Sequence, residues 1–303
     1  MYDLVIVGGG VVGLGAAMYA GRLNLKTAMI GDNIGGTITL TDIVENYPGF
    51  ERLTGLELAE KLRKHAENYD VALVESKVTD IEKKGSSFVI KTEEKSYEAK
   101  SILIATGSKH RELGVPGEKE FEGKGVHTCA LCDGYYYRDK IIAVVGGSDS
   151  AGKEALLLTQ WGKKVYIIYR GETIRPEPVN MKRIEANKKI EIINNTNVKE
   201  IKGDKMVKSV VLDKPYNGKN ELALDAVFVE IGATPMSYLA EKLGVKLSEK
   251  KEIIIDRESK TNVPGIFAAG DVVDTKFKQA ITGVGEAVSA VYSAYKYVNE
   301  NGL

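Results

Sequence analysis

Two apolar runs, each followed by a glycine-rich turn and a helical pattern, organise the sequence. Residues 3–7 (Asp-Leu-Val-Ile-Val) predict a strand buried on both faces, and residues 14–23 follow a helical pattern. The same order returns with a strand at 140–145 and a helix at 152–161. Two such openings in one chain predict an α/β protein with two Rossmann-like dinucleotide-binding domains.

Shorter patterns fill the rest of the chain. Residues 53–69 predict an amphipathic helix with Leu56, Leu58, Ala59 and Leu62 on its apolar side. The remaining predicted elements are a closing helix at 279–297 and strands at 27–30, 72–75, 78–81, 88–92, 97–99, 101–104, 164–169, 191–193, 210–212 and 226–231.

Both glycine turns have the spacing of a dinucleotide site. Gly8, Gly10 and Gly13 form G-x-G-x-x-G between a strand and a helix, so that the chain can turn, approach a pyrophosphate and pack helix on strand. The second turn, residues 146–151, is a G-x-G-x-x-A variant in which Ser148 replaces the middle glycine and would crowd the pyrophosphate. Structural glycine turns without a ligand are the alternative in both places.

Charged residues after the paired strands bear on which nucleotide binds. Arg170 and Arg175 follow the second strand of the second unit, where arginines can hold the ribose 2′-phosphate of NADPH or can be solvated surface charges. In the first unit, no acid ends the strand at 27–30, and Asp32 is expected to be a solvated loop residue.

Both cysteines of the chain fall in one short segment. Cys129 and Cys132 are separated by two residues and followed by Asp133, and such a pair can carry two electrons as a small disulfide ring. Two unrelated buried cysteines are the alternative. With 2 cysteines and 3 histidines in the chain, no zinc site is predicted. His127 could lower a cysteine pKa as an imidazolium, but we expect a surface or packing histidine.

Composition narrows the function classes. Among 303 residues, 42 Lys and Arg balance 42 Asp and Glu, which gives no sign of a nucleic-acid partner or an anionic membrane surface. Two cysteines argue against a disulfide-stapled secreted protein, and no apolar run approaches the roughly 20 residues of a membrane span. The first residues lack a signal-peptide pattern. These features predict a soluble cytoplasmic protein.

With these motifs in order, the chain resembles the low-molecular-weight thioredoxin reductases, which are FAD-dependent, two-domain members of the pyridine nucleotide–disulfide oxidoreductases. The resemblance runs essentially end to end. It rests on the glycine turns at 8–13 and 146–151, Val-Glu-Asn-Tyr-Pro-Gly (44–49), Ala-Thr-Gly (105–107), Cys-x-x-Cys-Asp (129–133), Ala-Ala-Gly-Asp (268–271) and Gln-Ala-Ile (279–281).

The resemblance implies a discontinuous domain arrangement. An FAD-binding domain would comprise residues 1–112 and 240–303, with an NAD(P)H-binding domain at 113–239 inserted into it and carrying the cysteine pair. The inserted domain would swing between two reactions on hinges near Leu113–Pro116 and Ile231–Pro235.

The resemblance also implies a relay of electrons and a set of site residues. A reduced nicotinamide would reduce the flavin, the flavin would reduce the Cys129–Cys132 disulfide, and the dithiol would reduce a thioredoxin or glutaredoxin-like protein. Cys132 would face the flavin, Asp133 would manage protons, and the protein would be a homodimer. The implied FAD-binding residues are Gly8, Gly10, Gly13, Gly36, Thr37, Asn46, Ala105, Gly107, Asp271, Gln279 and Ala280. The implied NADPH-binding residues are Gly146, Ser148, Asp149, Ser150, Ala151, Arg170 and Arg175.

Departures from the family pattern keep the electron donor open. The family's His-Arg-Arg-x-x-x-Arg reads here Tyr169-Arg170-Gly171, followed by Arg175, so one arginine is lost. Thr37 stands where the family's glycine pair is usually followed by Gln. We expect NADPH rather than NADH, with ferredoxin or a reduced deazaflavin as the alternative donor. A flavin redox sensor without turnover is the alternative from another class.

Overall fold

The chain divides into two compact units. The computed structural model describes residues 1–300, and the last three residues of the second FAD segment predicted above, 301–303, lie outside the described part. The first unit joins Met1–Lys109 to Thr234–Leu303, and the second is His110–Ala233. The two crossing segments, β7 (Ser108–His110) and β16 (Ala233–Pro235), pair with each other.

The first unit is built on a mixed sheet in the order β3-β2-β1-β6-β5-β4, with β17 paired to β6. Strands β3, β2, β1, β6 and β17 run parallel, and β4–β5 is an antiparallel hairpin that continues the sheet beside β6. The strands are β1 (Tyr2–Val7), β2 (Thr27–Gly31), β3 (Val71–Glu75), β4 (Val78–Lys84), β5 (Ser87–Thr92), β6 (Ser96–Ile104) and β17 (Ile266–Ala268).

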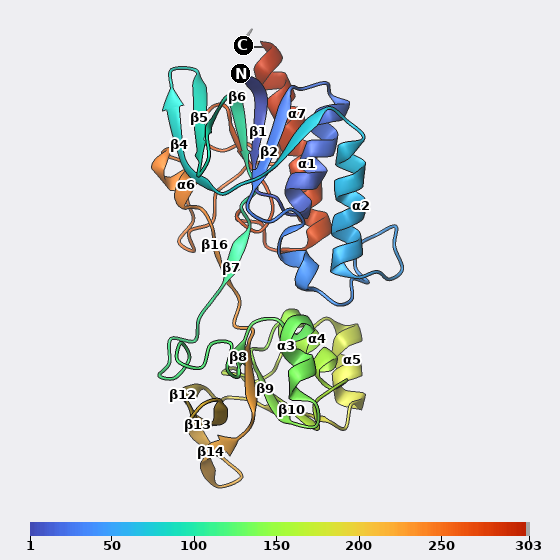
Figure 1. The fold of residues 1–303 in the computed structure, drawn as a ribbon, viewed down its shortest axis with the longest axis vertical. Helices are drawn as coiled ribbons and strands as arrows, with labels where there is room; N and C mark the ends of the chain where they lie inside the picture. Colours follow the sequence, from blue (N-terminus) through green and yellow to red (C-terminus); the bar gives the residue numbers. More distant parts are fainter. Residues whose placement is uncertain (301–303) are drawn as a thin grey trace. The chain divides into compact units, whose positions relative to one another are not determined.

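Alternate residues of β1 pack on opposite faces of this sheet, as a strand buried on both sides requires. Leu4 and Ile6 pack in a core with the helices, whereas Val5 and Val7 pack with the hairpin and the segment after α6. In Figure 1, α1, α2 and α7 lie together on one face of the sheet. The helices are α1 (Val11–Arg22), the 3-10 helix η1 (Gly36–Leu40), α2 (Gly55–Glu67), α6 (Tyr238–Lys242) and α7 (Ala280–Glu300).

The second unit is built on a parallel sheet in the order β11-β10-β9-β15-β8. Because every strand points the same way, all carboxyl ends lie at one edge, where ligands of such sheets bind. The strands are β8 (Val126–His127), β9 (Ile141–Val145), β10 (Lys164–Ile168), β11 (Ile190–Ile193) and β15 (Ala226–Val229).

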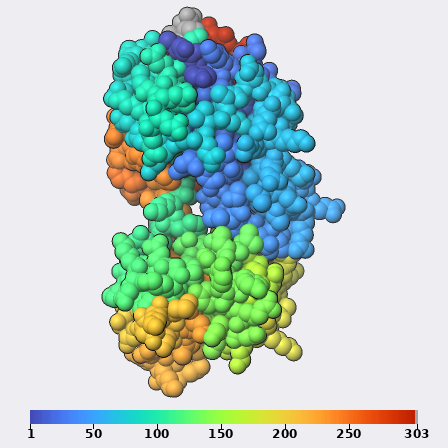
Figure 2. Space-filling model, viewed as in Figure 1, coloured from blue at the N-terminus to red at the C-terminus, as the bar shows by residue number. Residues whose placement is uncertain are grey.

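Helices cover one face of the second sheet and an antiparallel meander covers the other. Ile142 and Val144 pack with the helices, and Ala143 and Val145 pack with the meander. In space-filling view the gold meander and the green α3–α4 segment both reach the surface of this unit (Figure 2). These elements are α3 (Ala130–Asp133), η2 (Gly134–Tyr137), α4 (Asp149–Leu158), α5 (Pro178–Ala186), β12 (Val198–Gly203), β13 (Val207–Tyr216) and β14 (Lys219–Ala223).

The α/β class and the two Rossmann-like units are confirmed, but two local predictions were wrong. Leu56 is 52% exposed instead of lying on the apolar side of α2. The strands expected at 97–99 and 101–104 form one strand, β6. The sequence reading also missed α5. The hinges expected near Leu113–Pro116 and Ile231–Pro235 stay predictions.

Candidate redox and nucleotide sites

The cysteine pair lies in the turn that follows β8, at the carboxyl edge of the second sheet. Cys129 and Cys132 form a disulfide, with their Cα atoms 5.4 Å apart. Cys129 is buried and caps α3, because its Sγ accepts a hydrogen bond from the Cys132 N–H at 3.1 Å. Cys132 is exposed. The turn therefore presents one cysteine at the surface of the unit and holds the other inside.

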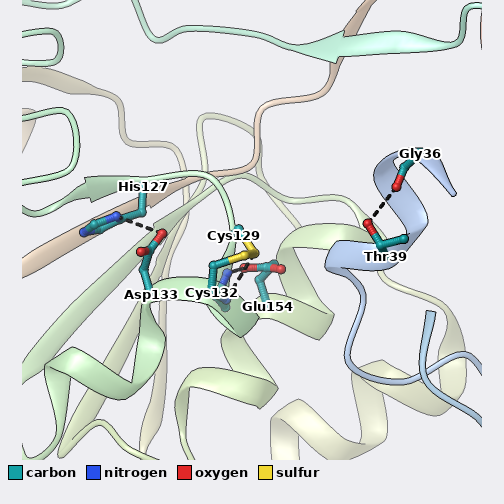
Figure 3. The surroundings of a disulfide bond; sticks show 8 residues. Gly36, Thr39, His127, Cys129, Cys132, Asp133 and Glu154 are labelled. Atoms are coloured by element: carbon teal, nitrogen blue, oxygen red, sulfur yellow. Dashed lines mark hydrogen bonds and ion pairs between the residues drawn. A yellow bond between two sulfur atoms is a disulfide. The ribbon is translucent and has the colours of Figure 1, made fainter. Parts of the chain in front are cut away.

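Asp133, the predicted proton-handling acid, faces a buried histidine (Figure 3). Its Oδ2 lies 3.1 Å from His127 Nδ1, and His127 Nε2 lies 2.7 Å from the Tyr137 hydroxyl. Burial lowers the pKa of His127, although Asp133 raises it in part, so the ring is neutral at pH 7. Burial, with the charges of Asp133 and Asp225, raises the pKa of Tyr137 to about 12. His127 is thus buried, with both ring nitrogens in hydrogen bonds.

Two carboxyl groups of the same unit have raised pKa values, and one of them is bonded to the redox turn. Glu154, on α4, accepts a hydrogen bond from the Ala130 N–H at 2.6 Å, and burial raises its pKa to about 7 (Figure 3). Glu230 directly follows β15, and burial together with the charge of Glu154 raises its pKa to about 8. His110 Nδ1 lies 3.8 Å from Glu230 Oε1, and burial lowers the His110 pKa.

The first glycine turn has the shape that a diphosphate requires. Gly8 has φ +131°, and a Cβ there would lie 2.1 Å from the Ala105 carbonyl oxygen. A Cβ on Gly13 would lie 2.0 Å from the Gly8 oxygen, so helix and strand touch at this position. A Cβ on Gly10 would meet only Gly36 Cα, at 3.9 Å, and Gly10 caps α1 without a side chain. The helix therefore begins with accessible backbone N–H groups, which suits an anionic ligand.

The other predicted FAD residues gather at the carboxyl edge of the first sheet. Ala105 and Gly107 follow β6, and Asp271 follows β17, its neighbour in the sheet. Asn46 donates a hydrogen bond from Nδ2 to Gln279 Oε1 at 3.0 Å, at the start of α7, where Ala280 is the first residue. Gly36 and Thr37 begin η1. These residues and the glycine turn fit a long dinucleotide held along one edge of a parallel sheet.

The second glycine turn follows β9 at the same edge as the cysteine pair. Gly146 has φ +155°, and a Cβ there would lie 2.1 Å from the Glu230 carbonyl oxygen. Ser148 is the N-cap of α4, but its side chain makes no capping hydrogen bond. Because Ser148 is exposed, its hydroxyl remains available to a ligand, and Ser150 is exposed as well. Asp149 Oδ1 instead accepts bonds from the Glu177 N–H and Asn180 Nδ2, both at 2.8 Å. This side chain therefore ties α4 to α5.

Arg170 and Arg175 lie beside this turn with free guanidinium groups. Both are exposed, and neither side chain makes a hydrogen bond or ion pair to another residue among 1–300. The Arg175 N–H donates to the Gly147 carbonyl at 2.7 Å, which fixes its backbone against the turn. Tyr169 covers the turn, since a Cβ on Gly147 would lie 2.4 Å from its ring. The site fits a nucleotide that carries an additional phosphate.

Sequence reasoning missed three polar residues of the second unit: Tyr137, Glu154 and Glu230. Glu230 stands between Val229 and Ile231 in an apolar run, and a carboxylate in that setting is a signal of a functional or paired acid. Tyr137 and Glu154 gave no such signal, because the contact of Tyr137 with His127 follows no helix or strand periodicity and Glu154 bonds to a backbone N–H. No group of three or more His, Cys, Asp or Glu residues among 1–300 could hold a metal ion. None of the described helices combines the length and apolarity needed to span a membrane.

Comparison with known proteins gives consistent matches over nearly the whole chain. The family model described as pyridine nucleotide-disulphide oxidoreductase matches residues 2–287. The thioredoxin reductase of Treponema pallidum (strain Nichols) is 40% identical over 304 residues, which covers 98% of this chain and 97% of that protein.

Solved structures agree with the sequence match. The thioredoxin reductase of Lactococcus lactis superposes with a TM-score of 0.95 at 40% identity, over 99% of this chain and 100% of that one. The thioredoxin reductase of T. acidophilum gives a TM-score of 0.92 at 35% identity, over 97% of this chain and 98% of that one.

Proposed function

The chain belongs to the pyridine nucleotide-disulphide oxidoreductase family, and from that premise we propose that it is a thioredoxin-disulfide reductase that uses FAD and NADPH. The observation that carries this proposal is the Cys129–Cys132 disulfide at the same sheet edge as a glycine turn, in a chain with a second glycine turn. When bound, FAD would take a hydride from NADPH and pass two electrons to the disulfide.

The first unit would bind FAD. The Gly8–Gly13 turn and the free N-terminus of α1 would hold the diphosphate, and Asp271 would accept hydrogen bonds from polyol hydroxyls. Asn46 and Gln279, already bonded to each other, would form a fixed polar pair for the isoalloxazine ring. The residues proposed for this role are Gly8, Gly10, Gly13, Gly36, Thr37, Asn46, Ala105, Gly107, Asp271, Gln279 and Ala280.

The second unit would bind NADPH in preference to NADH. Where an NADH site places an acid on the ribose 2′-hydroxyl at the end of the second strand, this chain has Tyr169 and Arg170. Arg170 and Arg175 are exposed and unpaired in the described chain, so either can meet a 2′-phosphate without breaking an existing bond. The proposed contacts are Gly146, Ser148, Ser150, Ala151, Arg170 and Arg175, with Asp149 supporting the turn.

The electrons would leave through the reduced cysteine pair to a thioredoxin-like protein. Cys132 lies at the surface, and Tyr135 and Tyr136 beside it are 60% and 76% exposed. Large exposed aromatic side chains next to a reactive group suit a protein partner better than a small disulfide. The reduced pair would attack the partner's disulfide, pass through a mixed disulfide and be oxidised again.

The test is an anaerobic titration of the purified protein with NADPH, NADH and reduced deazaflavin, followed by flavin absorbance. We expect bound flavin, faster bleaching by NADPH than by NADH, and multiple turnovers with an oxidised thioredoxin. Cys132→Ser should still be bleached by NADPH but should reduce no thioredoxin. A colourless protein, or a Cys132→Ser variant that turns over thioredoxin, would refute the function. Bleaching by reduced deazaflavin alone would refute the NADPH assignment only.

A further inference from the structure

His127 is the residue of the redox turn that the proposed relay leaves without a task. It lies on β8, two positions before Cys129, and is 9% exposed. Its ring stacks on Phe228, with centroids 5.3 Å apart, and meets the edge of Tyr137 at 5.4 Å. A buried histidine between two aromatic rings has one orientation, so its two nitrogens point in fixed directions.

The hydrogen bonds on the two nitrogens define the tautomer. Asp133 Oδ2 lies 3.1 Å from His127 Nδ1, and a carboxylate can only accept, so Nδ1 carries the proton and donates it. In a neutral imidazole Nε2 is then without a proton and accepts a hydrogen bond from the Tyr137 hydroxyl across 2.7 Å. The chain of donors therefore runs in one direction, from Tyr137 through His127 to the carboxylate.

The groups around this chain keep it in that state. Asp133 approaches the ring from α3 and Tyr137 from η2, while β15 contributes the apolar Phe228. Asp225 acts on Tyr137 from a distance and is itself bound to the Ile141 N–H at 2.9 Å and to Lys140 Nζ at 3.6 Å. In the described chain no cation lies against His127 that would stop its Nδ1–H from donating to a carboxylate.

We propose that His127 is a positioning residue for Asp133, and that the hydrogen bond from Tyr137 to Nε2 holds the ring in place for it. This proposal rests on the proposed thioredoxin reductase activity. Holding Oδ2 on His127 leaves Oδ1, which accepts no hydrogen bond within residues 1–300, for proton exchange with the redox pair. The Asp133 N–H also donates to the Cys129 carbonyl at 3.2 Å, so the acid is fixed from both sides.

The proton balance of the thiol exchange shows what this position achieves. The attacking thiol of the reduced pair gives its proton to the Asp133 carboxylate and becomes the thiolate that forms the mixed disulfide. The partner's departing sulfur takes that proton back as the partner's disulfide breaks. The second thiol of the pair then attacks the enzyme sulfur of the mixed disulfide, so that the Cys129–Cys132 disulfide forms again and the partner's remaining sulfur leaves with the proton of that thiol. Two electrons and two protons have then passed to the partner. A carboxylate free to rotate would be in place for a smaller fraction of encounters.

Two amide substitutions separate the two hydrogen bonds of the ring. In His127→Asn the amide nitrogen falls near the Nδ1 position and can donate to Asp133, but nothing reaches Tyr137. In His127→Gln the amide oxygen falls near Nε2 and can accept from Tyr137, but the bond to Asp133 is lost. Tyr137→Phe keeps the Asp133 bond and removes the donor to Nε2. Asn and Gln carry the same neutral amide group, so the two variants are matched in charge and polarity, and neither side chain is longer than that of histidine.

The measurement is single-turnover reduction of a purified oxidised thioredoxin by enzyme pre-reduced with NADPH, between about pH 5 and about pH 9. We expect His127→Gln to slow the exchange about tenfold, because the carboxylate of Asp133 loses the hydrogen bond that holds it. We expect His127→Asn to stay within about threefold of the wild-type rate and Tyr137→Phe to lie between them. The rate of flavin reduction by NADPH, measured separately, should be the same in all four proteins and reports intact folding.

Equal rates in His127→Asn and His127→Gln would overturn the proposal and leave His127 a packing residue. If both amides fail to fold, Tyr137→Phe decides by itself: a wild-type rate would overturn the role assigned to the hydrogen bond between Tyr137 and His127. A wild-type protein that transfers no electrons to thioredoxin at any pH would overturn the proposed function, and this proposal with it.

Discussion

Replacing Glu230 with Gln should stabilise the protein at high pH and leave its stability unchanged at low pH. Glu230 is 6% exposed, and burial, with the nearby charge of Glu154, raises its pKa from 4.5 to about 8. Below pH 4.5 the residue is protonated in both the folded and the unfolded chain, so it contributes nothing to the pH dependence. Between these two values only the unfolded chain ionises, so stability falls as the pH rises. Above pH 8 the loss is complete.

The size of the effect follows from the same two numbers. Each unit of pKa shift corresponds to about 1.4 kcal/mol of free energy. The rise in the pKa of Glu230 therefore sets an upper limit of roughly 5 kcal/mol on the free energy of unfolding that is lost at pH 9. Water entry and relaxation around the ionised carboxylate reduce the observable part, and we expect about 1–2 kcal/mol. For a folding unit of this size that corresponds to a rise in melting temperature of about 2–8 °C for Glu230→Gln.

The assay is scanning calorimetry of the wild type and of Glu230→Gln between about pH 5 and about pH 9. The two melting temperatures should agree at the acid end and separate steadily above neutrality. Glu172→Gln, at an exposed position of the same unit, is the matched control and should follow the wild type throughout. A constant difference between Glu230→Gln and wild type at every pH would refute the reasoning, because it would mean that Glu230 is ionised throughout.

Two further substitutions test the nucleotide sites. Gly13→Ala places a methyl group 2.0 Å from the Gly8 carbonyl oxygen and should abolish FAD retention. The measurement is flavin absorbance per protein after gel filtration. The control, Gly285→Ala, places its methyl group within 4 Å of nothing and should retain FAD. Arg175→Ala should raise the KM for NADPH about 10- to 100-fold, the value of one charge-assisted phosphate contact, and leave the KM for NADH unchanged; equal effects on both would mean that Arg175 does not bind the 2′-phosphate.

The two nucleotide folds could be predicted because their signals are local. A buried strand, a glycine turn and a helix follow one another within a few residues at both Gly8 and Gly146, so the sequence order itself encodes the geometry. The error at Leu56 is also local and has a simple cause. Leu56 precedes Leu58 by two positions, which is about 200° around a helix, so both cannot face the core.

The contacts of the redox turn could not be predicted because they join distant segments. His127 meets Phe228 only because β8 and β15 pair in a parallel register that aligns these two residues. Glu154 reaches the backbone of Ala130 from a helix that begins only after β9. Neither pairing leaves a periodicity or spacing in the sequence, so the position of the cysteine pair was evident while its surroundings were not.

The interrupted first unit has a consequence for synthesis on the ribosome. Strand β6 is complete at Ile104, but its partner β17 and the helix α7 that packs on α1 come only after the whole second unit. At about 5–20 residues per second, residues Ile102–Ile104 of β6 wait roughly 10–30 seconds for β17, while the earlier residues of that edge already pair with β5. The unit that starts first is therefore completed last, and the exposed β6 edge is the part of the nascent chain most open to chaperone binding or misassembly.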